Sequence, residues 1–210
     1  MRGAKRLSLG LVVALMASLN TINTVNISPV VAAEKITLLT AEDHGTGYVR
    51  TLFRHWIDAD KNGCNTRNEV LIAEATVKPK IGARCLLSGG KWLSPYDAKV
   101  FTKPTGLDID HMVPLAEAWR SGAWAWTSAQ RMAYANDMDD PRTLLAVTAG
   151  LNRSKGDKDV AQWLPPKAQC TYISNWIAVK ARFELTVDQV EADFLRTKIV
   201  SCNIANVVIA

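Results

Sequence analysis

The stretch LDIDHMVP, residues 107–114, places two acids and a histidine in an otherwise apolar run. Burying such groups without a charged partner is costly, and a bound cation would offset that cost. Histidine accepts protons near neutral pH, and a carboxylate oxygen beside it can bind a hard divalent metal. Asp108, Asp110 and His111 are therefore candidates for metal binding and acid–base chemistry.

A second polar stretch, LNRSKGDKD, covers residues 151–159, and its Asn152 lies 41 residues after His111. Asn152 offers a neutral carbonyl oxygen to a metal, while Arg153 and Lys155 offer positive charge to a phosphate. A proton acceptor, an oxygen-bound metal and basic side chains together suit hydrolysis of a phosphodiester. His111 would deprotonate water, and hard oxygen ligands favour Mg²⁺ or Mn²⁺ over Zn²⁺.

Two strands and a following segment must bring these stretches together. Residues 107–110 alternate strictly between apolar and acidic side chains, which predicts a strand, and residues 142–147 are a second candidate. A regular strand sends Asp110 and His111 to opposite faces, so they share a site only if the strand ends or bends there. Pro114 makes such an exit plausible.

Helical patterns flank these strands. Residues 48–56 predict a helix with an apolar face that includes Val49, Leu52 and Phe53. Residues 69–77 fit a helix or a strand. Residues 115–137 predict one helix that is broken or loosened near Gly122.

The two polar stretches resemble a known family. The sequence DIDHMVP followed by NRSKGD resembles the HNH nuclease pattern, the ββα-metal finger, in its D-H…N variant. The first motif is very similar to that of the HNH domain in RNA-guided CRISPR nucleases. Surrounding text, including GCNTRNEVL and VPLAEAW, is closer to secreted bacterial HNH-family nucleases, and the likeness covers about residues 48–166.

The resemblance implies a role for each matching residue. His111 would be the general base, Asp110 and Asn152 would hold one divalent metal, and Arg153 or Lys155 would approach the substrate backbone. The final metal-binding histidine of classical HNH proteins has no counterpart, because no histidine follows His111. Asn152 must then take part in binding, which implies weak metal affinity.

Several roles stay open at this stage. Asp108 could orient His111 or the basic residues, or it could form a structural salt bridge. Asp157 is a candidate to support the metal ligands through hydrogen bonds without binding the metal itself. For Arg153 and Lys155 the alternative is a solvated helix face, since charged pairs are common on exposed helices.

The stretch DADKNGCNTRNE, residues 58–69, fits the EF-hand calcium loop. Oxygen ligands would come from Asp58, Asp60, Asn62 and Glu69, with Gly63 at the sharp turn. Against calcium, no partner loop exists and the adjacent cysteine is expected in a disulfide. The alternative interpretation is a turn rich in Asp and Asn.

The N-terminus has the character of a signal peptide. A basic start, MRGAKR, precedes an uncharged apolar run, and small residues lie before Glu34. Residues 1–33 hold three of the 25 basic residues and no acid, leaving 22 basic against 20 acidic residues in the expected mature chain, 34–210. The mature net charge is therefore only +2, so any binding of phosphate depends on a local patch.

Four cysteines in an exported chain favour two disulfides. Three pairings are possible, and the local pattern supports one. Cys170 begins one helical pattern and Cys202 ends another that a Thr186–Gln189 capping box would start, so an antiparallel hairpin would join them. Cys64 and Cys85 would then form the second bond.

The sequence predicts an α+β fold: a ββα-metal (HNH) finger, core motif 107–160, within a mainly helical single domain with a C-terminal helical hairpin over 167–202. The predicted function is a secreted, metal-dependent endonuclease of low sequence specificity. We expect a monomer that acts on DNA, with RNA left open, and does not bind membranes once processed. The competing prediction is a calcium-dependent extracellular binding module built on residues 58–69.

Overall fold

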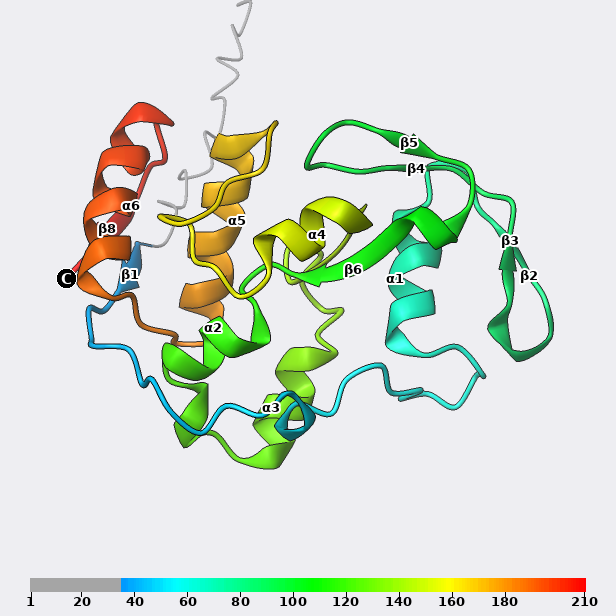
Figure 1. The fold of residues 1–210 in the computed structure, drawn as a ribbon, viewed down its shortest axis with the longest axis horizontal. Coiled ribbons are helices and arrows are strands. Elements are labelled where there is room, and N and C mark those ends of the chain that lie inside the picture. The colour runs from blue at the N-terminus through cyan, green and yellow to red at the C-terminus, as the bar shows by residue number, and fades with distance from the viewer. Residues whose placement is uncertain (1–34) are drawn as a thin grey trace, which may run out of the picture. The chain divides into compact units, whose positions relative to one another are not determined.

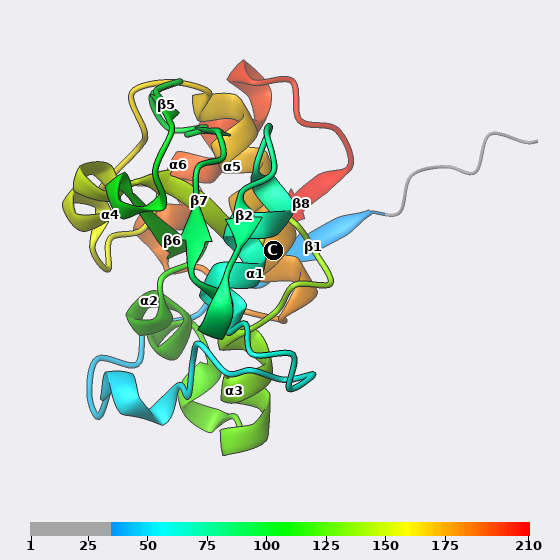
Figure 2. The same ribbon diagram turned by 90° about the vertical axis from the view of Figure 1, so that its right-hand side faces the viewer.

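A two-stranded antiparallel sheet positions the polar stretch 107–114. It consists of β6, Leu107–His111, and β7, Leu144–Thr148, and pairs His111 with Leu144 at one end. The computed structural model describes residues 35–210, so the predicted signal peptide lies outside the described residues. Helix α4, Ala149–Lys155, follows β7 directly. The three elements form a ββα unit (β6 and α4 in Figure 1, with β7 in Figure 2).

The sheet lies between α4 on one face and α1, Thr66–Glu74, on the other (Figure 1, Figure 2). The alternation of β6 explains this arrangement. Leu107 and Ile109 are buried and join a hydrophobic cluster with residues of α1, while Asp110 faces the α4 side, where it pairs with Lys155. Residues 69–77, which fitted either structure, are helical as far as Glu74.

Short strand pairs and four more helices complete the domain. The remaining strands form the pairs β1 with β8 (Ile36–Leu38, Val207–Ile209), β2 with β3 (Lys80–Ile81, Leu87–Ser88) and β4 with β5 (Trp92–Leu93, Val100–Phe101). The remaining helices are α2 (Leu115–Arg120), α3 (Ser128–Ala135), α5 (Gln169–Arg182) and α6 (Gln189–Ser201).

The largest hydrophobic core lies among α2, α3, α5 and α6, where Phe53, Tyr134 and Trp176 are fully buried. The fold is therefore α+β, with mainly helical surroundings for the ββα unit. Within residues 35–210, every helix falls short of the length and apolarity needed to span a bilayer.

Two disulfides join the predicted cysteines. Cys170 and Cys202 link the far ends of the α5–α6 hairpin, with their Cα atoms 5.4 Å apart. Cys64 and Cys85 form the second bond, with a Cα separation of 5.0 Å. The predicted pairing is confirmed, because two antiparallel helices joined by a short turn bring their ends together. Each bond stabilises the fold by about 3 kcal/mol in the loop-entropy description.

The start of α6 differs from the predicted capping box. Asp188 is the N-cap, and its side chain accepts a hydrogen bond from the Glu191 N–H at 2.8 Å. The Thr186 hydroxyl instead donates to the Ser121 carbonyl. Thr186 is part of an extended segment that reaches α2, so the helix starts later than its sequence pattern indicates.

The predicted helix over residues 48–56 is wrong. The only helical turn there is a 3₁₀ turn at Arg50–Leu52, and Val49 and Leu52 are 54% and 37% exposed. Phe53 alone is fully buried, among the rings of Tyr48, Trp119 and Tyr134. Packing of this aromatic anchor decides the backbone, and the apolar periodicity of the segment is incidental.

The predicted break near Gly122 is confirmed. Helix α2 ends at Arg120, and Gly122 has φ of +132°, a conformation that residues with a side chain rarely adopt. Helix α3 then starts from a capping box between Thr127 and Gln130. The break turns α3 back toward the end of β6.

Candidate active site

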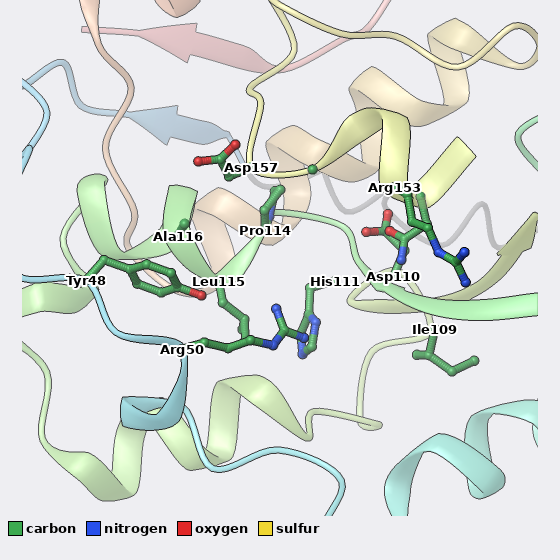
Figure 3. A pocket seen from close by; sticks show the side chains of 12 residues that line it. Tyr48, Arg50, Ile109, Asp110, His111, Pro114, Leu115, Ala116, Arg153 and Asp157 are labelled. Atoms are coloured by element: carbon green, nitrogen blue, oxygen red, sulfur yellow. The ribbon is translucent and has the colours of Figure 1, made fainter. Parts of the chain in front are cut away.

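A cleft of about 430 Å³ opens beside the end of β6. Asp110, His111 and Asn152 all line it, together with Arg153 and Asp157 (Figure 3). The strand ends at His111, and the chain turns away before Pro114. Asp110 and His111 leave the strand in different directions, yet both border the same cavity because the strand stops there.

His111 is buried, and its hydrogen bond defines the role of each ring nitrogen. Nε2 lies 3.0 Å from the carbonyl oxygen of Ala135, the last residue of α3. A carbonyl can only accept, so Nε2 carries the hydrogen and the neutral ring keeps its lone pair on Nδ1. The ring also stacks against Trp56 and Tyr134, at centroid distances of 5.5 and 6.2 Å. Nδ1 is therefore the nitrogen left to accept a proton.

Burial keeps the His111 ring neutral. It lowers the pKa of His111 to about 3, and the positive charge of Arg50 acts in the same direction. The hydrogen bond to Ala135 opposes this shift without reversing it. At neutral pH the imidazole is in the unprotonated form that a general base requires.

One oxygen of Asp110 is held from below. Oδ2 accepts hydrogen bonds from Lys155 Nζ, at 2.5 Å, and from the Tyr96 hydroxyl. Within residues 35–210, Oδ1 accepts no comparable bond. The carboxylate is thus fixed through one oxygen, and the other stays available to a ligand in the cleft.

Lys155 does not have its predicted role as a substrate contact. Its side chain is fully buried, and Nζ bonds the backbone carbonyls of His111 and Met112 at 2.9 and 2.8 Å as well as Asp110. The last turn of α4 lies directly over the strand end, so this lysine points inward. It fixes the backbone on which Asp110 and His111 are carried.

Asn152, Arg153 and Asp108 form a chain of contacts on the α4 side. Asn152 Nδ2 lies 3.4 Å from Asp108 Oδ2, which turns the amide oxygen away from that carboxylate. Arg153 Nε also lies 3.4 Å from Asp108 Oδ2, and the Arg153 side chain is 76% exposed. Asp108 therefore forms an ion pair with Arg153 and also contacts Asn152, so it can both bind and orient these side chains. It has no hydrogen bond to His111 among the described residues.

Asp157 lies in the cleft wall and is bound to Arg120. The carboxylate is 3.4 Å from Arg120 Nη1, and Arg120 also contacts Glu117 at 2.8 Å and Asp43 at 3.3 Å. These contacts join the segment after α4 to α2. Support of metal ligands by Asp157 stays a prediction.

The donor set of the cleft fits a hard divalent cation. Asp110 and Asn152, which both carry side-chain oxygens, line one cavity. Across residues 35–210, no three His, Cys, Asp or Glu side chains gather in the manner of a closed metal site. A cation here would complete its shell with water and phosphate, which suits Mg²⁺ or Mn²⁺ better than Zn²⁺.

Two polar residues of the cleft, Tyr48 and Arg50, are not among the candidates predicted from the sequence. In the helix predicted for residues 48–56, the apolar positions define the buried face, and these two residues lie on the face expected to contact solvent. Their i, i+2 spacing is the available signal, because alternate residues of a non-helical segment share a side. Tyr96, which binds Asp110, is a further residue that was not singled out as a candidate from the sequence.

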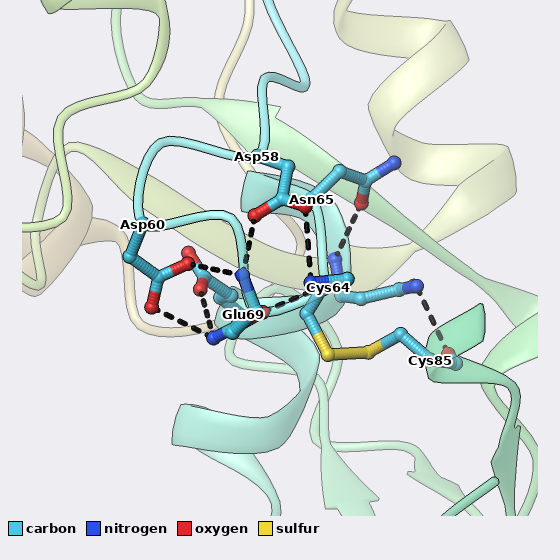
Figure 4. The surroundings of a disulfide bond; sticks show 9 residues. Asp58, Asp60, Cys64, Asn65, Glu69 and Cys85 are labelled. Atoms are coloured by element: carbon cyan, nitrogen blue, oxygen red, sulfur yellow. Dashed lines mark hydrogen bonds between the residues drawn. A yellow bond between two sulfur atoms is a disulfide. The ribbon is translucent and has the colours of Figure 1, made fainter. Parts of the chain in front are cut away.

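The calcium-loop pattern folds as a turn that satisfies its own oxygens (Figure 4). Asp58 accepts from the N–H groups of Asn62 and Gly63, at 3.1 and 3.0 Å. The Asn62 side-chain amide donates to Asp60 at 2.8 Å and to Glu69 at 3.2 Å. These contacts describe a turn rich in Asp and Asn ahead of α1. Nothing in them favours the calcium interpretation.

Comparisons with known proteins identify the family. Residues 47–198 match the family described as "GmrSD restriction endonucleases, C-terminal domain". A protein of the fungus Arthroderma benhamiae, named "Uncharacterized secreted protein", is 41% identical over 158 residues, which cover 74% of this chain and 76% of the relative. No solved structure matches.

These matches support a nuclease family and do not restrict it to the bacterial proteins that the motifs resemble, since this relative is fungal. The matched residues span the cleft, the ββα unit and most of the helical hairpin. The chain therefore belongs to the family of C-terminal domains of GmrSD restriction endonucleases.

Proposed function

We propose that the protein is an exported HNH-type endonuclease that hydrolyses nucleic-acid phosphodiester bonds with a divalent metal and little sequence specificity. One observation carries the proposal: Asp110, His111 and Asn152 line one cleft of a ββα unit. Membership of a nuclease family supports the reaction class. The name of the fungal relative, the two disulfides and the leader-like N-terminus support export.

His111 performs the proton transfer in this proposal. Nδ1 removes a proton from the attacking water, while the Nε2–H bond to Ala135 holds the ring in its orientation. Asp110 and Asn152 would hold Mg²⁺ or Mn²⁺ through their side-chain oxygens, and the bound cation would supply positive charge to the transition state and the leaving oxygen. The exposed side chain of Arg153 binds a backbone phosphate.

Recognition in this proposal depends on the nucleic-acid backbone. The expected mature chain is only slightly basic, and the exposed cleft arginines can reach phosphates but form no array that reads bases. Binding should therefore weaken steeply with salt and vary little with sequence. DNA is the expected substrate, and RNA is to be compared with it.

The test is cleavage of plasmid DNA by the purified exported chain. We expect no cleavage in EDTA and recovery when Mg²⁺ or Mn²⁺ is added. His111→Ala should reduce the rate by about 1,000-fold, within the range for loss of a general base. The reason is that no other described cleft residue offers an imidazole.

His44→Ala is the matched control, because His44 lies outside the cleft and stacks on Trp124. It should keep nearly the wild-type rate. Melting curves must show that both variants are folded. A folded His111→Ala protein with the wild-type rate, or a wild-type protein inactive with Mg²⁺, Mn²⁺ and Ca²⁺ alike, would refute the proposed function.

A further inference from the structure

Arg50 has a position in the cleft that the proposed function does not yet use. It is the first residue of the 3₁₀ turn Arg50–Leu52, its side chain is exposed, and it lines the cleft together with Tyr48. In Figure 3 its guanidinium extends toward His111, and Arg153 lies on the other side of Asp110. Two arginines thus border the predicted catalytic residues from different elements.

Arg50 and Arg120 differ in the charges that surround them. Arg120 contacts the carboxylates of Asp43, Glu117 and Asp157, so its charge is compensated within the protein. Among residues 35–210, Arg50 forms no ion pair with any carboxylate. Its guanidinium lies beside the neutral Tyr48 hydroxyl, so its charge is not compensated and can attract an anion in the cleft.

The backbone that carries Arg50 is firmly anchored. The Phe53 N–H donates to the Arg50 carbonyl at 3.1 Å, and the Phe53 ring is fully buried. Three residues further along, Trp56 stacks on His111. Asn136, the C-cap of α3, donates to the Arg54 carbonyl at 2.8 Å. Arg50 is therefore held in place by the same packing that holds the His111 ring.

Arg50 and His111 line the same cleft, so a phosphate bound between them would contact the uncompensated guanidinium. The planar fork of arginine donates two parallel hydrogen bonds to phosphate oxygens, which lysine cannot do.

We propose that Arg50 binds the scissile phosphate on the side opposite Arg153 and stabilises the charge that develops on its non-bridging oxygens. This inference rests on the proposed function and deepens it by naming a second phosphate contact from outside the ββα unit. Arg50 is then a catalytic residue, since it touches the reacting group. Arg153 binds a flank of the same backbone.

The first test compares Arg50→Ala with Arg54→Ala in Mn²⁺-dependent cleavage of a DNA duplex. Arg54 is exposed, lies in the same segment and carries the same charge, but it is not a cleft residue. Arg50→Ala should lower kcat/KM by about 100-fold, as loss of a transition-state hydrogen-bond donor does. Arg54→Ala should change kcat/KM by less than about 3-fold, as expected for a rim charge.

Arg50→Lys adds a further distinction, because it keeps the charge and loses the fork. We expect it to recover binding but only part of kcat. A merely structural role for Arg50 would instead appear as an equal loss of melting temperature in the alanine and lysine variants.

A second test measures binding without cleavage, so that failure of the proposed function can be recognised separately. Each arginine variant is combined with His111→Ala, and binding of a fluorescein-labelled duplex is followed against NaCl concentration in EDTA. Arg50→Ala should reduce the slope of log K against log salt by about 0.9, the value for one lost phosphate contact. Arg54→Ala should leave it unchanged.

The outcomes separate clearly. If the wild-type protein cleaves nothing but Arg50→Ala still reduces the salt slope of binding, the proposed nuclease activity is refuted and the phosphate contact is supported. A folded Arg50→Ala protein that matches Arg54→Ala in both kcat/KM and salt slope would overturn the inference.

Discussion

Two lysines, Lys155 and Lys180, are fully buried in different parts of the domain and are held in different ways. Lys180 Nζ contacts two carboxylates, Glu117 at 2.8 Å and Glu191 at 2.5 Å, and so ties α5 to α2 and α6. Lys155 Nζ contacts one carboxylate, Asp110, and two backbone carbonyls at the end of β6. The first lysine belongs to the helical core, and the second lies beneath the cleft.

Their pKa values respond in opposite directions. The carboxylates around Lys180 outweigh the effect of burial and raise the pKa of that lysine, while Glu117 and Glu191, which share one ammonium, have pKa values shifted down and up, respectively. Burial dominates at Lys155 and lowers its pKa, because Asp110 is its single anionic partner. In the helical core two carboxylates surround one ammonium group. In the site Lys155 binds only Oδ2 of Asp110, so Oδ1 is left for a ligand.

Replacing Lys180 should have the largest effect on stability. Lys180→Met leaves Glu191 without a cation and Glu117 with Arg120 alone, and we expect a loss of about 5 kcal/mol in the free energy of unfolding, at the upper end for breaking a buried ion pair. Urea unfolding measures this. The protein that remains folded should keep its specific nuclease activity, because the cleft does not include this network.

A second substitution checks the cause. Adding Glu191→Gln to Lys180→Met removes one stranded charge and should restore part of the lost stability. If Lys180→Met costs less than about 1 kcal/mol of unfolding free energy, as is typical of exposed ion pairs, then Lys180 does not stabilise the helical core through its buried carboxylates.

Lys155→Met should cost somewhat less stability but more activity. We expect a loss of about 3 kcal/mol, since a single carboxylate is stranded. The end of β6 also loses the contact that fixes Asp110 and the backbone of His111, so the folded fraction should lose activity. The measurement is specific activity normalised to the folded fraction.

Lys158→Met is the matched control, because Lys158 follows the same helix and is exposed. It should leave activity and stability close to wild type. If folded Lys155→Met protein kept full activity, Lys155 would be a core residue of the same kind as Lys180, and the contrast between the two regions would disappear.

The sequence predicts most of the elements that depend on local pattern. The alternation in β6, the strand candidate that became β7, the break at Gly122 and the cysteine-linked hairpin are all local, because each follows from residues close together in the chain. They agree with the structure. The meeting of Asp110 and Asn152 at one cleft could also be anticipated, since antiparallel strands followed directly by a helix return the chain to its start.

The inward turn of Lys155 and the position of Arg50 could not be predicted. Lys155 lies in a run of charges typical of a solvated helix, and only the tilt of α4 over β6 determines that it is buried. Arg50 lies in a segment whose apolar spacing resembles that of a helix. Its backbone is instead set by the packing of Phe53 against Trp119 and Tyr134, which lie far along the chain. Both are decided by tertiary contacts.

Glu74 extends the comparison, because it is a buried carboxylate without a lysine. It is the last residue of α1, and its Oε2 accepts a hydrogen bond from the Ala146 N–H of β7 at 2.9 Å. Burial raises the pKa of Glu74 to about 7 from an ordinary 4.5, and the Ala146 bond opposes the rise only in part. No described cation within reach offsets the charge.

The sign of the effect on stability follows from this raised pKa. Below pH 4.5 the carboxyl is protonated in both the folded and the unfolded chain, so burial costs nothing. Between pH 4.5 and 7 the unfolded chain releases the proton first, and stability falls as pH rises. Glu74→Gln keeps an oxygen for Ala146 and removes the charge.

We therefore expect Glu74→Gln to match wild type near pH 4.5 and to exceed it by about 3 kcal/mol at pH 8, since the pKa is raised from 4.5 to about 7 and each unit is worth about 1.4 kcal/mol. Urea unfolding across this range measures the difference. Glu117→Gln, which removes a carboxylate whose pKa is lowered beside Lys180 and Arg120, should bring no such gain. Equal stability of wild type and Glu74→Gln at pH 8 would mean that the α1 carboxylate is compensated after all, as Glu117 is.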